Sequence, residues 1–416
     1  MHEVQAEAAR LVAGVLGGRS IDEADFAGPA GRAAPLRDLT LGTLRRLGTH
    51  RAVAAGLASR GFTDPRLESL VCVALHQLQH TRAAAHAVVT EAVQAARISG
   101  LAQASGFVNA ALRRFLRESE RCVAQARTTP EGLWNHPAWW VDRVRAAYPD
   151  RAEAILSAGT DHPPMTLRVN QRRATVASLL ETLAAAGIEA RAAGPVAIRL
   201  QRPRPTRELP GHAEGLFSVQ DAGAQWAAPL LDLAPGMRVL DACAAPGGKA
   251  CHVLESADVA LTALDLDATR LGAIRQPLAR LGLEARLLQA DAGQPDRWWD
   301  GQPFDRVLLD APCSASGIVR RHPDARWLRR PEDLARFAAT QRRLLAALWQ
   351  VLAPGGKLLY VTCSVFPEEN AHVVRDWLSR SSDARLLPLE GFPAPDGVLL
   401  PSGEHDGFFY ALLHKR

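Results

Sequence analysis

The chain has 416 residues, of which 47% are hydrophobic and 22% are charged, and its formal net charge is +5. This composition is typical of a globular protein and excludes a disordered or fibrous one, while the length predicts two or three domains. No apolar run approaches the ~20 residues that span a bilayer, and the first residues lack the features of a secretory signal. We therefore expect a cytoplasmic protein without a membrane segment.

The six cysteines are scattered along the chain, at positions 72, 122, 243, 251, 313 and 363. None of them forms a CxxC pair, which is the spacing typical of a cysteine zinc cluster. Without a secretory signal the thiols should stay reduced, so disulfides are not expected. The cysteine pattern therefore predicts neither a metal centre nor a disulfide framework.

The first part of the chain has helical periodicity and no convincing strand. Apolar residues recur at helical spacing in 3–16, and Gly28-Pro29 interrupts the pattern that follows. Further helices are predicted over four ranges, 35–59, 66–80, 82–99 and 104–119. We therefore predict an all-α bundle over residues 1–128.

This helical region also carries the positive charge of the chain. Residues 1–130 hold 16 arginines against 11 acidic residues, which suggests a polyanionic partner. Arg113, Arg114 and Arg117 lie on one amphipathic segment and could contact phosphates. A solvated helix face explains the same arginines equally well.

The middle of the chain, residues 129–213, is predicted to be a linker followed by a small α+β subdomain of RRM-like type. Strands are expected at 166–170, 188–191 and 196–200, with a helix at 176–186. Three prolines, at 203, 205 and 210, then mark a boundary.

Residues 214–416 alternate between apolar strands and helices. The predicted strands are Arg238–Asp241, Ala260–Asp265, Ala285–Gln289, Arg306–Asp310 and Lys357–Thr362, and the longest predicted helices are Ala268–Leu281 and Asp333–Leu352. This alternation predicts an α/β domain with a mostly parallel sheet that helices cover on both faces. Ligands of such sheets bind at the carboxyl ends of the strands.

A glycine turn follows the first of these strands. Asp241 ends the strand, the turn is formed by small residues, and a helix begins near Lys249. The turn comprises Cys243, Ala244, Ala245, Pro246, Gly247, Gly248 and Lys249. Glycines let a ligand approach the backbone closely, but the stretch is neither GxGxxG nor a P-loop. S-adenosylmethionine therefore fits better than a dinucleotide or ATP, whereas an ordinary strand–helix turn is the plain alternative.

Acidic residues follow several other strands. Asp265 could accept hydrogen bonds from both ribose hydroxyls of such a cofactor, since the neighbouring Asp267 is better placed to cap the next helix. Asp291 could accept a hydrogen bond from an adenine amino group, or it could cap a turn.

Two cysteines also follow strands. Cys313 lies three residues after Asp310, and Cys363 follows the strand that ends at Thr362. A buried free cysteine is usually inert, but two at one functional edge of a sheet are harder to dismiss. A redox pair remains an alternative, although no local motif supports one.

Three stretches, Asp241–Lys249, Asp310–Gly317 and Thr362–Asn370, resemble the motifs of RNA cytosine-5 methyltransferases of the NOL1/NOP2/Sun group. The helical N-terminus is similar to the NusB-like RNA-binding domain of a bacterial ribosomal RNA member, and Phe107–Leu116 matches the last helix of that domain. Shorter matches are Leu167–Asn170, Phe217–Gln225, Arg320–Trp327 and His405–Tyr410. The resemblance implies a Rossmann-like S-adenosylmethionine-dependent methyltransferase domain over residues 214–416.

The resemblance also implies roles for the residues of the site. Cys363 would be the nucleophile that adds to C6 of cytosine, and Cys313 would serve proton removal at C5 and product release. Asp310 would bind the N3/N4 edge of the base and contribute to the cofactor site. Lys249 would hold its helix start or a carboxylate, and a purely structural pairing with Asp241 stays open. The cofactor contacts implied by the resemblance are Cys243–Lys249, Asp265, Asp291 and Asp310.

The implied substrate is RNA, and the resemblance alone points to 16S ribosomal RNA. A base attacked at C6 must be unstacked, which favours a single-stranded or loop cytosine. Arg320, Arg321 and His322 are placed to meet its phosphates, or they form a surface loop. We expect a monomer. The alternatives are a non-catalytic RNA-binding or antitermination-type factor, a methyltransferase for another RNA such as tRNA, and one for proteins or small molecules.

Overall fold

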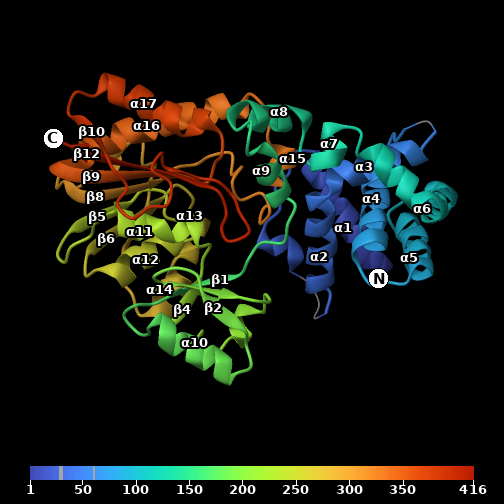
Figure 1. The fold of residues 1–416 in the computed structure, drawn as a ribbon, viewed down its shortest axis with the longest axis horizontal. Coiled ribbons are helices and arrows are strands. Elements are labelled where there is room, and N and C mark those ends of the chain that lie inside the picture. The colour runs from blue at the N-terminus through green and yellow to red at the C-terminus, as the bar shows by residue number, and fades with distance from the viewer. Residues whose placement is uncertain (28–30, 60) are drawn as a thin grey trace. The chain divides into compact units, whose positions relative to one another are not determined.

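The computed structural model describes residues 1–27, 31–59 and 61–416, so the predicted break at Gly28-Pro29 lies outside the described residues. The chain divides into two compact units (Figure 1). The N-terminal unit comprises Met1–His162 and Val319–Pro331, and the C-terminal unit comprises Pro163–Ile318 and Glu332–Arg416. Among the described residues, no helix has both the length and the apolar character of a membrane span.

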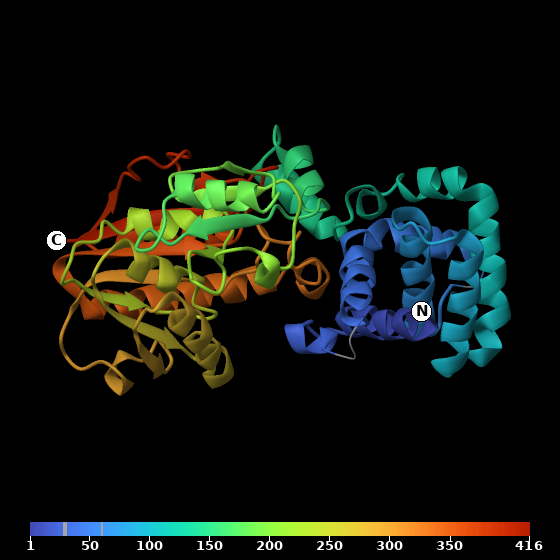
Figure 2. The same cartoon turned by 90° about the horizontal axis from the view of Figure 1, so that it is seen from below.

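The N-terminal unit is helical (its first 162 residues run from blue to green in Figure 2, and its late segment Val319–Pro331 is orange). Its helices are α1 His2–Leu16, α2 Ala33–Arg45, α3 Leu47–Leu57, α4 Pro65–His80, α5 Ala85–Ile98, α6 Ser105–Ala126, α7 Pro130–Trp134, α8 Ala138–Ala147, α9 Ala152–Ala158 and α15 Ala325–Leu328. The predicted helix 35–59 is wrong as one element, because the backbone of Arg46 leaves the helical region between α2 and α3. The predicted helix 104–119 continues to Ala126 through a kink at Glu118.

This unit extends past residue 128, where we placed the domain boundary. The helices α7, α8 and α9 belong to it, as does the late segment Val319–Pro331. The Asn135 side chain accepts a hydrogen bond from the Thr49 backbone at 2.8 Å, and the buried Arg326 donates to the carbonyls of Asn135 and Gly159. Such contacts join positions up to 191 residues apart, so a local sequence pattern cannot predict them.

The C-terminal unit begins with a small antiparallel sheet in the order β2-β3-β1-β4. Its elements are β1 Thr166–Val169, α10 Val176–Ala185, β2 Ala190–Ala192, β3 Ala197–Leu200 and β4 Phe217–Val219. Leu179 and Leu183 of α10 are fully buried against Phe217 and other apolar residues of the sheet. β4 lies beyond the boundary predicted at residue 213, yet it pairs with β1 and completes this sheet.

The rest of the unit is an eight-stranded sheet in the order β10-β12-β9-β8-β5-β6-β7, with β11 paired to β12. Its strands are β5 Arg238–Asp241, β6 Ala260–Asp265, β7 Arg286–Gln289, β8 Phe304–Asp310, β9 Leu352–Thr362, β10 Ala384–Leu387, β11 Val398–Leu399 and β12 Phe408–Lys415. The strands β9, β8, β5, β6 and β7 pair in parallel, whereas β12 runs antiparallel to β9. This confirms the predicted α/β class, although β10, β11 and β12 were not foreseen as strands.

Helices cover both faces of this sheet (Figure 1). They are α11 Ala227–Leu230, α12 Gly248–Ser256, α13 Ala268–Ala273, α14 Arg275–Leu281, α16 Asp333–Val351 and α17 Ala371–Arg380. One apolar core lies beneath α11–α14, and a second lies beneath α16 and α17. Because the central strands are parallel, their carboxyl ends meet at one edge, where Asp241, Asp265, Asp310 and Thr362 end β5, β6, β8 and β9.

Candidate active site

The glycine turn after β5 leads directly into α12. Gly247 has a φ of 97°, a conformation that favours glycine, and a Cβ on it would lie 2.8 Å from Cγ2 of Ile274. The turn is closed by the Gly247 N–H, which donates to the Ala244 carbonyl at 2.7 Å. The backbone thus stays bare of side chains at the point where α12 begins.

Asp265 is directed at this turn. Its carboxylate accepts hydrogen bonds from the backbone N–H of Ala245 and of Asp267, each at 3.1 Å. As expected, Asp267 caps the next helix by accepting from the N–H groups of Thr269 and Arg270. Asp265 therefore links the glycine turn to the end of β6 and leaves the capping role to its neighbour.

Asp291 is held by other protein groups. It accepts from the Gly293 N–H at 2.8 Å, and it forms an ion pair with Arg343 of α16 at 3.0 Å. The turn-capping alternative therefore describes its contacts in the structure, and its carboxylate is about a quarter exposed.

The two cysteines that follow β8 and β9 lie side by side. Their sulfur atoms are 3.4 Å apart, within hydrogen-bond distance for thiols. Close backbone packing holds the two loops together, because the Gly317 N–H donates to the Cys363 carbonyl at 2.8 Å. The hydrogen bond to Cys363, followed by burial, raises the pKa of Cys313 well above its ordinary value.

A buried carboxylate that the sequence analysis missed ties these loops. Glu369 accepts from the Ser314 backbone at 2.7 Å and from the hydroxyls of Ser314 and Ser364 at 2.6 Å each. Ser314 and Ser364 directly follow the two cysteines, so one side chain fixes the backbone beside both thiols. Burial raises the pKa of Glu369, against the lowering effect of these hydrogen bonds. The only available signal was its place in the Thr362–Asn370 motif.

A charged pair completes this side of the site. The Lys249 Nζ atom lies 2.6 Å from Oδ2 of Asp310, so the lysine pairs with Asp310 and not with Asp241. Burial lowers the pKa of Lys249, but Asp310 and further negative charge at Cys363 and Asp241 outweigh it and raise that pKa. The fully buried Asp241 has its pKa raised to about 7, first by burial and then by repulsion from Asp310. Lys249 therefore supplies a positive charge beside Asp310 that also interacts electrostatically with Cys363 and Asp241.

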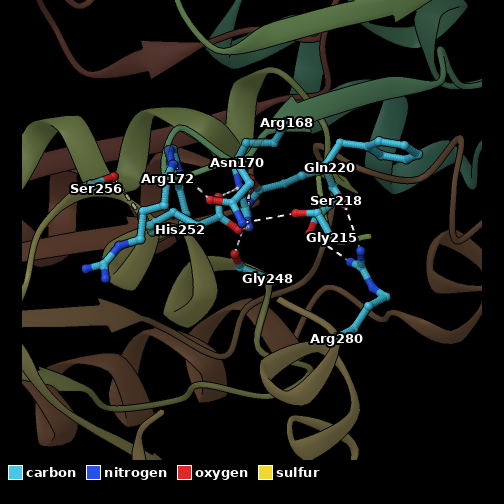
Figure 3. Close-up of polar contacts among 12 residues, drawn as sticks. Arg168, Asn170, Arg172, Gly215, Ser218, Gln220, Gly248, His252, Ser256 and Arg280 are labelled. Carbon is cyan, nitrogen blue, oxygen red and sulfur yellow. Dashed lines mark hydrogen bonds and ion pairs between the residues drawn. The ribbon is translucent and has the colours of Figure 1, made fainter. Parts of the chain in front are cut away.

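A second residue without an assigned role, Arg168, connects the small sheet to the glycine turn (Figure 3). Its fully buried guanidinium donates to the Glu255 carboxylate at 2.8 Å through both Nε and Nη2. Its Nη1 atom donates to the Gly248 carbonyl at 2.6 Å and to the Gln220 side chain at 2.7 Å. The start of α12 is therefore held from β1.

The arginines predicted to meet RNA lie in the N-terminal unit and differ in exposure. Arg113 and Arg117 on α6 are exposed, whereas Arg114 is half-buried and pairs with Glu118. His322 is exposed and Arg321 is half-buried. The Arg320 side chain is only 2% exposed, which contradicts its expected contact with a phosphate in this conformation. Burial of one residue in a basic run is set by tertiary packing, which the run itself does not encode.

The strand-end edge of the C-terminal unit thus combines a thiol pair, a partly buried ammonium–carboxylate pair and a bare glycine turn. Such a site can form a covalent bond from sulfur to an electrophilic carbon and can move a proton at a neighbouring atom. Cys313, Cys363, Asp310, Lys249 and the end of β5 lie together, whereas Asp291 is engaged with Arg343.

Three family models match the chain. The model described as 16S rRNA methyltransferase RsmB/F covers residues 228–414, an RsmF/B-like ferredoxin-like domain covers 136–207, and the NusB family covers 22–117. The ferredoxin-like match stops before β4, which pairs with the same small sheet.

Relatives match over most of their length. Ribosomal RNA small subunit methyltransferase B of Pseudomonas syringae is 45% identical over 91% of this chain and 88% of its own. The protein of the same name in Pseudomonas putida is 43% identical over 98% of this chain and 97% of its own. Among solved structures, a methyltransferase homolog protein from Pyrococcus horikoshii matches with a TM-score of 0.61 at 30% identity, over 69% of this chain and 97% of that one.

Proposed function

The chain belongs to the 16S rRNA methyltransferase RsmB/F family, and from this premise we propose that it methylates C5 of a cytosine in 16S ribosomal RNA through a cysteine–cytosine adduct. The observation that carries the proposal is the 3.4 Å approach of the Cys313 and Cys363 sulfurs beside the Lys249–Asp310 pair. A ribosomal RNA substrate places the reaction in the cytoplasm.

The residues around the glycine turn fit S-adenosylmethionine as the methyl donor. The positive φ and crowded Cα of Gly247 keep the turn free of side chains, which suits close approach of a ligand. Asp265, fixed by two backbone N–H groups, would hold the ribose hydroxyls, while Asp291 and the turn residues 243–248 would hold the remainder. When bound, this cofactor supplies an electrophilic methyl group on a positively charged sulfur.

Cytosine C5 is a poor nucleophile until C6 has been attacked. The Cys363 thiolate, after losing its proton to water, forms a bond to C6 and pushes electron density onto C5. Lys249 supports the negative sulfur by charge, and Asp310 holds the N3/N4 edge of the base by hydrogen bonding. C5 is then nucleophilic enough to accept a methyl group.

Release of the product requires removal of the C5 proton. When a base takes this proton, the C5–C6 double bond forms again, the C6–S bond breaks, and the electron pair returns to Cys363. We assign the base to Cys313, because its sulfur lies 3.4 Å from that of Cys363 and so would be near C5 when Cys363 is bonded to C6. Cys313 must give up its own proton to solvent before this step.

The test compares wild type with Cys363→Ala and Cys313→Ala on protein-free 16S ribosomal RNA with methyl-labelled S-adenosylmethionine. We expect 5-methylcytosine with wild type, no transfer with Cys363→Ala, and an RNA–protein adduct that survives denaturing electrophoresis with Cys313→Ala. Cys122→Ala, which changes a half-buried cysteine of α6, is the matched control and should retain wild-type turnover.

Undiminished methylation by Cys363→Ala would overturn the mechanism. RNA binding without any methylation by the wild-type protein would instead favour the non-catalytic RNA-binding alternative. Label recovered in tRNA but not in 16S ribosomal RNA would show that the substrate is tRNA, and the proposed cysteine chemistry would still apply.

A further inference from the structure

A cluster of three histidines in the N-terminal unit has no part in the reaction proposed above. His50 lies on α3, and His76 and His80 lie four residues apart on α4, on the same face of that helix. Each imidazole offers one ligand nitrogen, the three nitrogens lie within 4.8 Å of one another, and the ring centroids are 5.2–5.8 Å apart. Figure 1 shows α3 beside α4 in this unit.

The cluster contains buried nitrogens that the protein leaves unsatisfied. His50 is fully buried, and among the described residues neither of its ring nitrogens has a hydrogen-bond partner. The Nδ1 atom of His76, a residue 5% exposed, also has none. Buried polar atoms without partners are costly, so orphaned nitrogens that converge from two helices point to a ligand that accepts their lone pairs.

Neutral imidazole is the form of histidine that binds zinc-class ions. The ordinary histidine pKa of about 6.5 leaves this form in the majority near pH 7.

We propose that His50, His76 and His80 bind one divalent transition-metal ion of the zinc class, which ties α3 to α4. Three imidazole nitrogens suit Zn²⁺ and Co²⁺, and the exposed side of His80 leaves a fourth position open to water. A tetrahedral ion with Zn–N bonds of about 2.0–2.1 Å places its ligand atoms about 3.3 Å apart, so ligand atoms that lie within 4.8 Å of one another close by up to about 1.5 Å on binding. Gly42 of α2 leaves room for the His76 ring, because a Cβ there would lie 2.2 Å from Nε2 of His76.

The expectation of no metal centre was based on cysteine spacing, which cannot detect a site made of histidines. The His-x₃-His spacing at 76 and 80 was the available sequence signal, and His50 joins it only through the packing of α3 on α4. The positive charge of Arg46 acts on His76 and His80 and opposes the binding of a cation. Arg46→Gln should therefore tighten the binding of Co²⁺.

The experiment uses the full-length chain without a histidine tag, stripped by a chelator and kept reduced. Co²⁺ is titrated and followed by visible absorbance, and Zn²⁺ is then added as a competitor. We expect one Co²⁺ per chain, bands typical of a four-coordinate nitrogen and oxygen site, and no strong near-ultraviolet thiolate band, since thiolates such as those of Cys313 and Cys363 would produce one.

His80→Gln should weaken Co²⁺ binding at least about tenfold, and His76→Gln should do the same. His86→Gln, which changes an exposed histidine of α5, is the matched control and should bind like wild type. Circular dichroism of each variant shows whether the helical unit is folded. Titration that fails to saturate at one ion per chain, or equal affinity of His80→Gln and wild type, would overturn the proposal.

Discussion

The two sides of the strand-end edge are held together by different kinds of contact. On the cofactor side, Asp265 rests on backbone N–H groups of the adjacent turn and of its own loop. On the cysteine side, Glu369 joins side chains of two loops that are up to 55 positions away in sequence. The contacts of Asp265 are confined to neighbouring backbone, which can adjust to a small change. The contacts on the cysteine side all depend on the one buried carboxylate of Glu369. Changes on the cysteine side should therefore reduce turnover, and changes on the cofactor side should mainly affect cofactor binding.

The largest effect on turnover is expected when the carboxylate of Glu369 is removed. Glu369→Ala removes the acceptor that the Ser314 N–H and the hydroxyls of Ser314 and Ser364 share, and it loosens the loops beside both thiols. Displacement of reacting groups by about 1 Å can cost about a hundredfold in rate, so kcat should fall at least about that much. The KM for S-adenosylmethionine should change little. Steady-state methylation assays with varied cofactor measure both constants.

Two variants separate positioning from general loss of structure. Glu369→Gln keeps the shape and one acceptor oxygen, and it should recover part of kcat. Glu368→Ala removes the neighbouring, half-buried glutamate and should leave kcat close to wild type. If Glu369→Ala folds normally by circular dichroism and keeps full kcat, the positioning role is wrong.

Asp241 lies where the two sides meet, and it makes stability depend on pH. Its pKa is about 7 in the folded protein and about 3.9 in an unfolded chain, so between these values the folded state binds more protons. The free energy of unfolding contributed by this group therefore falls as pH rises from about 4 to 7, with a slope of at most about 1.4 kcal/mol per pH unit. Asp241→Asn should remove that slope.

Urea unfolding at several pH values measures this effect. The expected outcome is that Asp241→Asn is more stable than wild type above pH 7 and gains little near pH 4. Parallel pH profiles of the two proteins would show that the pKa of Asp241 is not raised by folding, in which case burial and repulsion from Asp310 do not act on it as described.

The contrast also explains which parts of the site were predictable from sequence. The bounds of β5 and β6 and the residues of the glycine turn follow from contiguous patterns, since apolar strands and small turn residues act locally. Glu369 and Arg168 were missed because their roles depend on distant partners, Ser314 at 55 positions and Glu255 at 87 positions. β12 was missed as a strand because its antiparallel pairing to β9 breaks the strand–helix alternation on which the prediction relied.

The smallest expected effects lie on the cofactor side, and they decide whether Asp291 contacts the cofactor. Asp265→Asn keeps the acceptor oxygen but loses the charge, so the KM for S-adenosylmethionine should rise about tenfold, with kcat nearly unchanged. Asp291→Asn should raise it only a few-fold, because Arg343 already engages this carboxylate.

Arg343→Gln is the matched partner for Asp291→Asn, since it breaks the same ion pair but keeps the carboxylate. If Asp291 touches the cofactor, Asp291→Asn raises the KM while Arg343→Gln leaves it unchanged or lowers it, because the freed carboxylate can turn to the adenine amino group. If the two variants raise the KM equally, Asp291 acts only by pairing α16 to the turn after β7. Cofactor titration by calorimetry, without RNA, separates these outcomes, because binding is then read without the steps that follow it.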